Sequence, residues 1–557
     1  MAALLLTALL FLFLTSMSNR GRVQEEDKEG PLVQVEQGLL RGLRGLSVRE
    51  KEFLAFLGIP YAKPPTGELR FKAPRPPEPW NGTFEATEEG SSCPQIGLMS
   101  QKKEGDENCL FLNVFTNKLP EDPNDLKAVM VWIHGGAFVA GSATSVMFGP
   151  DHLLTEDIVF VSINYRLGIL GFLSLPGAGI PGNNGMKDQV MALRWVQKNI
   201  AKFGGDPNRV TIFGQSAGGA SAHFHLLSPM STGLFHGAIS QSGTGLASWA
   251  YAEPEYIRGA AFKIGAKIRC DAADDKELLQ CFRETPATDF VDVFGYEDET
   301  GVSLGEFRPT KEDGSVNGEE VFLPGRPAAL VSSRKFHVVP FLTGINSKEA
   351  LTFTALTEKP SFWDKFDKNF DKVVADVTGE DVSRVKEVSE RIKRYYFGDR
   401  KPSEETLDSF IDCFTDFSFF IGADRAVKKH AAFSTAPVYY YYFEFEGDLG
   451  VAKRALNVTK PGVAHGDELG YLFSTAISPP IEERSEENKT LTTVVKMWTN
   501  FAKTGDPTME MNSILDIKWN PATKRDPVYL DINKEMGMQH ALLKERAAVW
   551  DEAFGPL

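Results

Sequence analysis

A five-residue stretch, Gly214-Gln215-Ser216-Ala217-Gly218, places a serine between two glycines that stand two positions before and two positions after it. The β-branched and aromatic run before it favours a strand, and the small residues after it favour the start of a helix. Glycines at those positions permit the close backbone approach of a strained strand-to-helix turn, which exposes the serine Oγ. The pattern therefore predicts that Ser216 is a nucleophile in a turn of this kind, called a nucleophile elbow. The amide of Ala217, at the helix N-terminus, would face a developing oxyanion.

A second stretch, Gly301-Val302-Ser303-Leu304-Gly305, has the same spacing. It follows an acidic run at 296–300, and no apolar strand leads into it. We interpret it as a surface loop, so Ser303 is not expected to be the nucleophile.

A serine nucleophile needs an imidazole to take its proton and a carboxylate to hold that imidazole. In a nucleophile-elbow fold the histidine comes after the serine, which excludes His134 and His152. The remaining candidates are His223, His225, His236, His337, His430, His465 and His540. His465 has the best context, because the small residues of 462–466 suit a loop beyond a strand end.

The acid is expected between Ser216 and His465, just after a strand, because catalytic groups gather at strand ends in α/β sheets. Glu349 meets this condition, since it follows an apolar strand predicted at 338–342. By residue type alone, a solvated surface carboxylate beside Lys348 would be the better interpretation.

The oxyanion hole needs backbone amides from a glycine-rich loop after an earlier strand, and the stretch from Val131 to Phe138 supplies such a loop. Two glycines after a strand also make an ordinary turn. The leading His134, and the position one strand before Asn164-Tyr165-Arg166-Leu167-Gly168, favour the oxyanion loop.

Three continuous apolar runs, at 110–115, 128–133 and 158–163, are typical of strands covered on both faces in an α/β sheet. A helix is predicted over 185–203, where an apolar stripe recurs every three or four residues and Lys187 and Asp188 fall largely off that stripe. Later strands are expected at 237–242, 338–342 and 437–443, with charged helical segments between 243 and 336 and closing helices at about 485–504 and 540–554. The sequence therefore predicts one large α/β domain over 31–557, with a mostly parallel sheet, helices on both faces and helical insertions.

The composition is acidic, with 75 Asp and Glu against 60 Lys and Arg and a net charge of −15, which argues against nucleic acid and anionic membranes as partners. Residues 1–18 read as a signal peptide, residues 19–30 as a flexible segment, and no later run is long and apolar enough to span a membrane. We expect a secreted protein with glycosylation sequons at Asn81, Asn457 and Asn488. No pattern predicts an oligomeric state.

Five cysteines fit an oxidising compartment. Cys93 and Cys109 form one local pair, Cys270 and Cys281 another, and Cys413 is left over. Two disulfides and a metal site are both open to such residues, but no histidine stands at ligand spacing around them, so a metal is not expected. A serine mechanism of the kind described above needs no metal and no cofactor.

Taken together, these motifs closely resemble the carboxylesterase/cholinesterase family of α/β-hydrolases over essentially all of residues 30–555. Further stretches fall in family order: Gly58-Ile-Pro-Tyr-Ala, Glu107-Asn-Cys-Leu-Phe-Leu-Asn113, Gly171-Phe-Leu-Ser, Asp188-Gln189, Gly344-Ile-Asn-Ser-Lys-Glu349, Gly462-Val-Ala-His465 and Asn500-Phe-Ala-Lys-Thr-Gly-Asp-Pro507. The resemblance implies Ser216 as nucleophile, Glu349 as acid and His465 as base. It implies amides of Gly136, Ala137 and Ala217 as oxyanion donors, Gly135 as a shaping residue, and disulfides Cys93–Cys109 and Cys270–Cys281.

The sequence departs from the family pattern at four positions. Gln215 replaces the usual Glu before the serine and resembles the insect juvenile hormone esterase branch, while Ala350 and Ala137 stand where Gly is usual or frequent. Asn108 replaces the usual Asp and removes an expected buried partner for an arginine.

The resemblance implies a secreted serine carboxylesterase that acts on small hydrophobic esters, either generally or as a juvenile hormone esterase. A cholinesterase should carry a tryptophan in the loop between the first two cysteines, but residues 95–107 contain no aromatic side chain. A non-catalytic adhesion protein of this fold would typically have lost a member of the catalytic triad, and this chain has lost none.

Overall fold

The computed structural model describes residues 30–47, 50–122, 124–291, 305–314, 318–359, 361–509 and 515–554. The expected signal peptide at 1–18, the flexible segment up to residue 29, and Ser303 lie outside the described residues.

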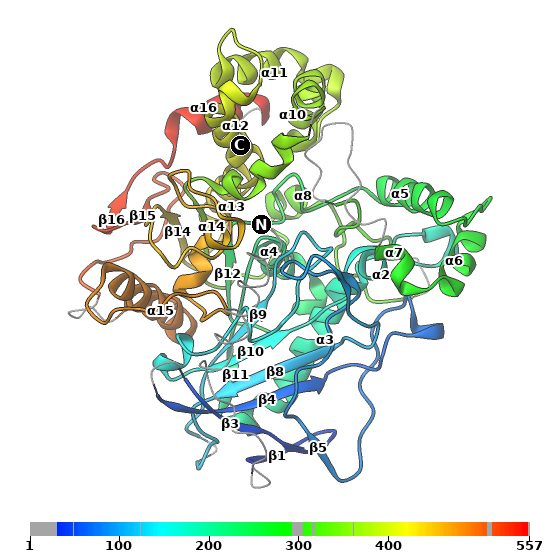
Figure 1. Ribbon diagram of the computed structural model, residues 1–557, viewed down its shortest axis with the longest axis vertical. Helices are drawn as coiled ribbons and strands as arrows, with labels where there is room; N and C mark the ends of the chain where they lie inside the picture. Colours follow the sequence, from blue (N-terminus) through cyan, green and yellow to red (C-terminus); the bar gives the residue numbers. More distant parts are fainter. Residues whose placement is uncertain are drawn as a thin grey trace, which may run out of the picture.

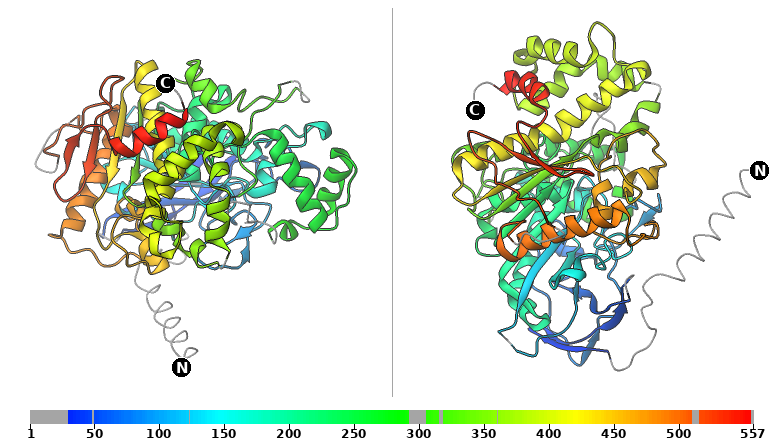
Figure 2. Two further views of the ribbon diagram at one scale, coloured as in Figure 1. Left: turned by 90° about the horizontal axis from the view of Figure 1, so that it is seen from above. Right: turned by 90° about the vertical axis from the view of Figure 1, so that its left-hand side faces the viewer.

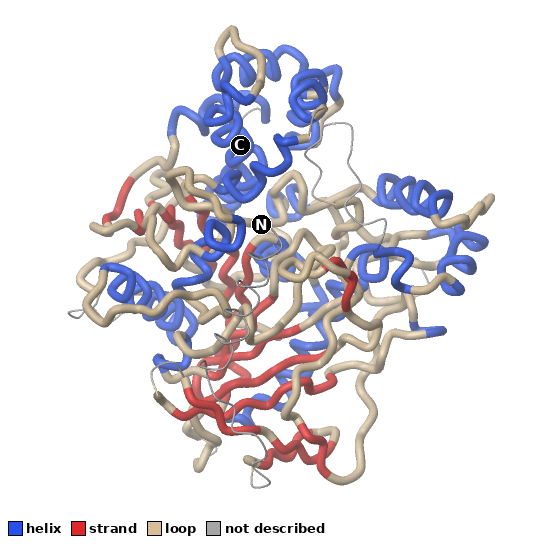
Figure 3. Tube along the Cα trace, viewed as in Figure 1, coloured by secondary structure: helices blue, strands red, loops and turns tan. Residues whose placement is uncertain are grey.

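An eleven-stranded sheet runs through the middle of the molecule (Figures 1 and 3). Its strands, in spatial order, are β16 (Gly537–Gln539), β15 (Tyr529–Ile532), β14 (Val438–Phe443), β13 (Phe341–Asn346), β12 (Gly237–Gln241), β11 (Gly205–Gln215), β9 (Lys127–Ile133), β10 (Val159–Ile163), β8 (Phe111–Thr116), β4 (Glu52–Pro60) and β3 (Leu43–Leu46). The strands from β15 to β10 in this order are parallel, and both edges are antiparallel. The expected mostly parallel sheet is confirmed.

Two smaller sheets complete the strand content of the described residues. One pairs β1 (Leu32–Val35), β2 (Gly38–Arg41) and β5 (Thr83–Glu85), and the other pairs β6 (Gln95–Ile96) with β7 (Lys103–Glu104). β1 and β2 form an antiparallel hairpin at the start of the described chain.

The large sheet is buried on both faces, as its continuous apolar runs predict. Along β9, Val129, Val131 and Ile133 face the core that contains helices α3 and α4, whereas Ala128, Met130 and Trp132 face the core that contains α15. The main helices of these two layers are α3 (Asn184–Asn199), α4 (Ala217–Leu227) and α15 (Glu486–Thr504). The alternation of strand side chains therefore builds one core on each face.

Helical insertions form two separate groups at the periphery (Figures 1 and 2). One group consists of α5 (Pro254–Lys267), α6 (Asp275–Glu284) and α7 (Ala287–Val291). The other contains α10 (Phe370–Thr378), α11 (Val382–Phe397), α12 (Leu407–Thr415) and α16 (Lys544–Phe554). The remaining helices are α2 (Gly168–Phe172), α8 (Pro327–Ser332), α9 (Phe362–Lys368), α13 (Ile421–Phe433) and α14 (Val451–Leu456).

The helix predicted over 185–203 corresponds to α3 and a following 3₁₀ turn, Ile200–Phe203, and its apolar stripe is fully buried. Lys187 and Asp188 lie off that stripe, yet both are buried too. Asp188 pairs with Arg166 at 2.7 Å, and Lys187 pairs with Glu312 at 2.7 Å. These two ion pairs therefore bury the helix face that periodicity alone would leave in solvent.

The strand predicted at 338–342 is wrong in its position, because β13 begins at Phe341. Pro340 explains the shift, since proline has no N–H to donate to a sheet, and Val338 before it is 53% exposed.

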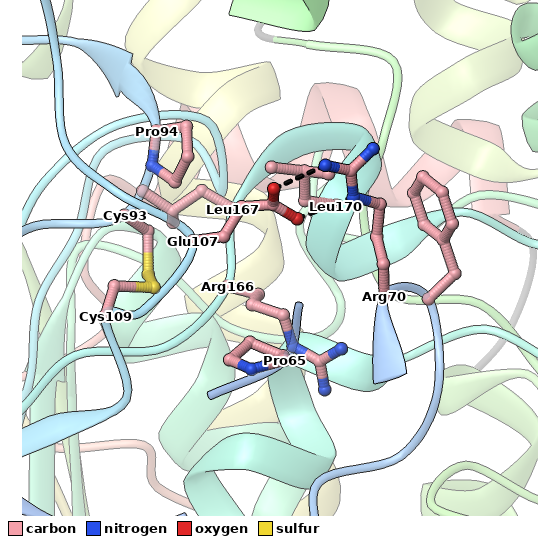
Figure 4. Close-up of a pocket in the computed structure, with 10 residues that line it drawn as sticks. Pro65, Arg70, Cys93, Pro94, Glu107, Cys109, Arg166, Leu167 and Leu170 are labelled. Atoms are coloured by element: carbon pink, nitrogen blue, oxygen red, sulfur yellow. Dashed lines mark hydrogen bonds and ion pairs between the residues drawn. A yellow bond between two sulfur atoms is a disulfide. The ribbon is translucent and has the colours of Figure 1, made fainter. Parts of the chain in front are cut away.

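The two implied disulfides, Cys93–Cys109 and Cys270–Cys281, are both present, and Cys413 is free and buried. Next to the first disulfide, Arg70 and Glu107 form an ion pair beside a small cavity of about 10 Å³ (Figure 4). The expectation that Asn108 deprives an arginine of its carboxylate is therefore wrong, because the neighbouring Glu107 provides that group.

Asn81 and Asn457 are exposed, whereas Asn488 is half-buried as a residue and its side-chain amide donates to the Glu483 carbonyl at 2.7 Å. None of the helices among the described residues is long and apolar enough to cross a membrane. In the same described ranges, no group of three or more His, Cys, Asp or Glu side chains is arranged to hold a metal ion.

Candidate active site

Ser216 lies in the sharp turn between β11 and α4, as the sequence predicts. Its backbone has φ of 59° and ψ of −124°, an unfavourable conformation for a residue with a side chain. The Ser216 amide donates to the Gln241 carbonyl of β12 at 2.8 Å, which fixes the turn to the neighbouring strand. A Cβ added at Gly218 would lie 1.9 Å from the Ile133 carbonyl oxygen, and one at Gly214 would lie 2.4 Å from Gly218. Both flanking glycines are therefore required by close backbone contacts.

The loop after β9 approaches this turn directly. A Cβ added at Gly135 would lie 3.0 Å from Ser216 Cβ and 2.7 Å from the Gln215 carbonyl oxygen. Gly136, Ala137 and Phe138 all have positive φ, at 108°, 54° and 62°. For the two residues with side chains this is strained backbone of the kind that clusters at functional sites.

Over the described part of the chain, the amides of Gly136, Ala137 and Ala217 donate to no protein acceptor. The loop itself is held by other bonds, among them Ala140 N to Gly136 O at 3.0 Å and Gly168 N to Phe138 O at 2.7 Å. Free amides on a loop fixed in this way fit donors that await an oxyanion.

His134, excluded as a base by its position in the chain, has a structural place in the same loop. Its ring stacks on Tyr165 with centroids 4.4 Å apart, and its Nδ1 lies 2.8 Å from the Gly135 carbonyl oxygen. Burial lowers the pKa of His134 to about 4, so the neutral ring donates from Nδ1 to that carbonyl. His134 therefore shapes the turn at Gly135.

His465 and Glu349 meet in the loops that follow β14 and β13. His465 Nδ1 lies 2.7 Å from Glu349 Oε2, and the His465 amide donates to the Glu349 carbonyl at 3.3 Å. The other carboxylate oxygen of Glu349, Oε1, accepts from the backbone amide of Asn346 at 2.8 Å. Glu349 is completely buried, which rules out the alternative interpretation as a solvated surface charge.

Gln215, singled out in the sequence only as an unusual residue, contacts the candidate base directly. Its side-chain Nε2 lies 3.1 Å from His465 Nε2, and the residue is 5% exposed. The contact joins residues 250 positions apart and sets the imidazole beside the nucleophile turn. Nothing in the local sequence could have revealed it.

Glu468 is a buried carboxyl that the sequence analysis missed. Its oxygens accept from Asn346 Nδ2 at 2.6 Å and from Gln241 Nε2 at 3.2 Å. Burial, and then the nearby Glu349, raise the pKa of Glu468 to about 7. The available signal was its place three residues after His465, within the same loop.

Aromatic side chains surround the candidate base. The ring of Phe419 lies 4.4 Å from that of His465, and the ring of Phe353 lies 5.6 Å from it. Phe419 belongs to a π-helical turn, Asp416–Phe420, and is also in contact with Trp249, whose ring is 6.4 Å from Phe138 of the oxyanion loop. Aromatic rings therefore cover one side of the His465 imidazole, while Gln215 and Glu349 contact its two nitrogens.

The other candidate histidines take different positions. His223 Nε2 contacts His430 Nε2 at 3.0 Å in a buried pair, and His225 bonds to Ser231 and Gln189. His337 contacts the Ser228 carbonyl, His236 contacts the Val210 amide, and His540 pairs with Asp526 on the surface. Among the described residues, His465 is the one histidine that contacts Glu349.

The parallel sheet, the strand-to-helix serine turn and the covering helices define an α/β-hydrolase. The model of the carboxylesterase family matches residues 29–550, and the chain belongs to this family. It is therefore a carboxylic ester hydrolase.

Three relatives illustrate the match. Esterase FE4 of Myzus persicae is 38% identical over 508 residues, which cover 88% of each chain, and juvenile hormone esterase of Tribolium castaneum is 34% identical over 89% of this chain and 87% of the relative. The crystal structure of juvenile hormone esterase from Manduca sexta, with OTFP covalently attached, superposes with a TM-score of 0.86 at 29% identity, covering 94% of this chain and 99% of that one.

Proposed function

We propose that the protein hydrolyses hydrophobic carboxylic esters through an acyl-enzyme on Ser216. The observation that carries the proposal is the buried contact of 2.7 Å between His465 Nδ1 and Glu349 Oε2, on an imidazole whose other nitrogen faces the residue before Ser216. Such a carboxylate fixes the proton on Nδ1 and leaves Nε2 with the lone pair of a base.

The reaction then runs in two halves. Ser216 Oγ attacks the ester carbonyl carbon while His465 Nε2 takes its proton, and the amides of Gly136, Ala137 and Ala217 donate to the oxyanion. When the tetrahedral intermediate collapses, the carbon–oxygen bond to the alcohol breaks and His465 protonates the leaving alkoxide. Water, deprotonated by the same nitrogen, releases the acid and restores the serine.

The aromatic surroundings support hydrophobic esters as substrates. Phe138, Trp249, Phe353 and Phe419 offer apolar contact area and no charge. A cholinesterase activity is less well supported, because residues 95–107 contain no aromatic side chain to hold a quaternary ammonium.

Within the family, a juvenile hormone esterase is the more specific candidate. Gln215 in the serine motif supports it, as do the relatives that carry this name in Tribolium castaneum and Manduca sexta. A general carboxylesterase is the alternative, in keeping with the likeness to Esterase FE4.

We further propose that residues 31–557 form a single domain, secreted after removal of the signal peptide at 1–18. Two disulfides and the exposed Asn81 and Asn457 support an oxidising, glycosylating route.

The test expresses the full chain in insect cells and collects it from the medium. Wild type and Ser216→Ala are compared on a juvenile-hormone-like epoxy methyl ester and on a short aryl ester. We expect secreted activity on both esters, with a lower KM for the hormone-like ester, and a loss of at least about 10³-fold in kcat in Ser216→Ala. Full activity in Ser216→Ala would refute the mechanism, and a lower KM for the aryl ester would favour the general carboxylesterase.

A further inference from the structure

The side chain of Gln215 lies against His465 Nε2, the nitrogen that must accept the Ser216 proton in the proposed reaction. Glu349 accepts from His465 Nδ1, so that nitrogen carries the proton and Nε2 presents a lone pair. Gln215 Nε2 lies 3.1 Å from His465 Nε2, and its N–H donates to that lone pair. In the resting protein, an amide N–H therefore holds the nitrogen that would receive the Ser216 proton.

Two loops pack against the Gln215 side chain. Gln215 is 5% exposed, it ends β11, and its carboxamide oxygen lies 3.1 Å from where a Cβ of Gly135 would stand. The loop glycine at 466, with φ of 92°, passes the same amide, since its added Cβ would lie 3.8 Å from Gln215 Nε2. The amide is thus packed between the oxyanion loop and the histidine loop.

The charged groups around His465 explain why a neutral partner matters. Glu349 faces Nδ1, and Glu468 from the same loop as the histidine interacts electrostatically with the imidazole. Asp467 caps the loop through the Ala464 amide, Lys348 on the other loop is engaged by Asp412, and Phe353 and Phe419 add no charge. A carboxylate at 215 would be the first negative charge in direct contact with Nε2.

We propose that Gln215 is a positioning residue that holds the imidazole of His465 through Nε2 without placing a charge beside that nitrogen. The inference rests on the proposed function. An amide can donate to the neutral ring and, after turning over, accept from the Nε2–H of the imidazolium, so it supports both forms. A carboxylate can only accept, and its charge would favour the protonated ring.

The test is the pH dependence of kcat/KM for a neutral aryl ester, measured on the full chain with Gln215→Glu. We expect the midpoint of the acid limb to rise by about one pH unit or more, because the added carboxylate stabilises the imidazolium. Gln280→Glu, on the exposed face of α6, adds the same charge away from the site and should leave the limb where it is in wild type.

Gln215→Met provides a second variant of similar length that cannot hydrogen-bond. We expect it to lower kcat with little change in KM, and to leave the acid limb closer to wild type than Gln215→Glu does. An unmoved acid limb in an active Gln215→Glu enzyme would overturn the proposal, and so would wild-type kcat in Gln215→Met. Activity that persists in Ser216→Ala would instead contradict the proposed function, so the two failures are distinguishable.

Discussion

At the scale of single residues, the site depends on glycines that let neighbouring backbone segments come close together. Gly214, Gly218 and Gly135 each stand where a Cβ would collide with main chain or with Ser216. These close contacts explain why the sequence motif has glycine at these positions. His134 belongs to the same set, because its buried neutral ring holds the carbonyl of Gly135.

Gly218→Ala tests this account of the elbow. The new methyl would lie 1.9 Å from the Ile133 carbonyl oxygen and 2.8 Å from that of His134, so α4 must move away from β9. We expect a loss of at least about 2 kcal/mol in the free energy of unfolding and a loss of esterase activity. Gly259→Ala, in α5 with nothing within 4 Å of the added Cβ, is the matched control and should not destabilise. Comparable stability of the two variants in denaturant titration would contradict the account.

The limits of sequence reasoning are clearest at this scale. Spacing, chain order and the family resemblance together pointed to Ser216, Glu349 and His465 as candidates, and the structure places the latter two in contact. The contact of Gln215 with His465 and the burial of Glu468 could not be predicted, because each depends on loops that meet only after the sheet has formed. Arg70 pairs with the carboxylate of Glu107, one residue before position 108, where the family pattern suggested an acidic partner.

At the scale of elements, α4 links the elbow to a layer of buried polar groups. His223 of α4 contacts His430 of α13, with Gly245 N donating to His223 Nδ1 at 3.2 Å. The aromatic rings of Phe336 and Phe341 pack against His430. Burial lowers the pKa of His430 to about 4 and that of His223 well below its ordinary value.

These shifts predict how acid affects the packing of α4 on α13. A histidine with a lowered pKa binds fewer protons in the folded chain than in the unfolded chain between pH about 4 and about 6.5. Its favourable contribution is therefore complete above pH about 6.5 and is lost as the pH falls toward 4. Buried Asp416 and Asp424, whose pKa values burial raises to about 6, act in the opposite sense, so the histidine effect must be isolated by substitution.

His430→Gln removes one titrating group and keeps a hydrogen-bonding partner for His223. We expect the stability of wild type relative to this variant to fall by about 2 kcal/mol between pH 7.5 and pH 4.5, as followed by thermal unfolding. His540→Gln, on the exposed surface, is the control and should follow the slope of wild type. Parallel pH profiles for wild type and His430→Gln would show that the buried pair does not govern acid stability.

Elements also show why some boundaries escaped prediction. The continuous apolar runs of β9 and β10 identified strands covered on both faces. The short edge strands β15 and β16 have no such run, and their pairing comes from neighbours in the sheet. The pattern placed Lys187 and Asp188 on a polar face of the helix, but both are buried in ion pairs with residues from distant segments.

At the scale of the whole molecule, one sheet with a core on each face carries the site at the ends of its parallel strands. The turn after β11, the loop after β9 and the loops after β13 and β14 all meet there, which is where an α/β sheet brings catalytic groups together. The peripheral helices add the aromatic rings around His465 through the π-helical turn at Asp416–Phe420. Fold and family follow from this arrangement.

The central claim is that Ser216 carries the acyl group. The most direct measurement is covalent labelling of the secreted enzyme with a fluorophosphonate, followed by mass spectrometry of its peptides. The account predicts one adduct per active chain, on Ser216, formed in step with the loss of esterase activity. Complete loss of activity with the adduct on another residue, such as Ser303, would contradict it.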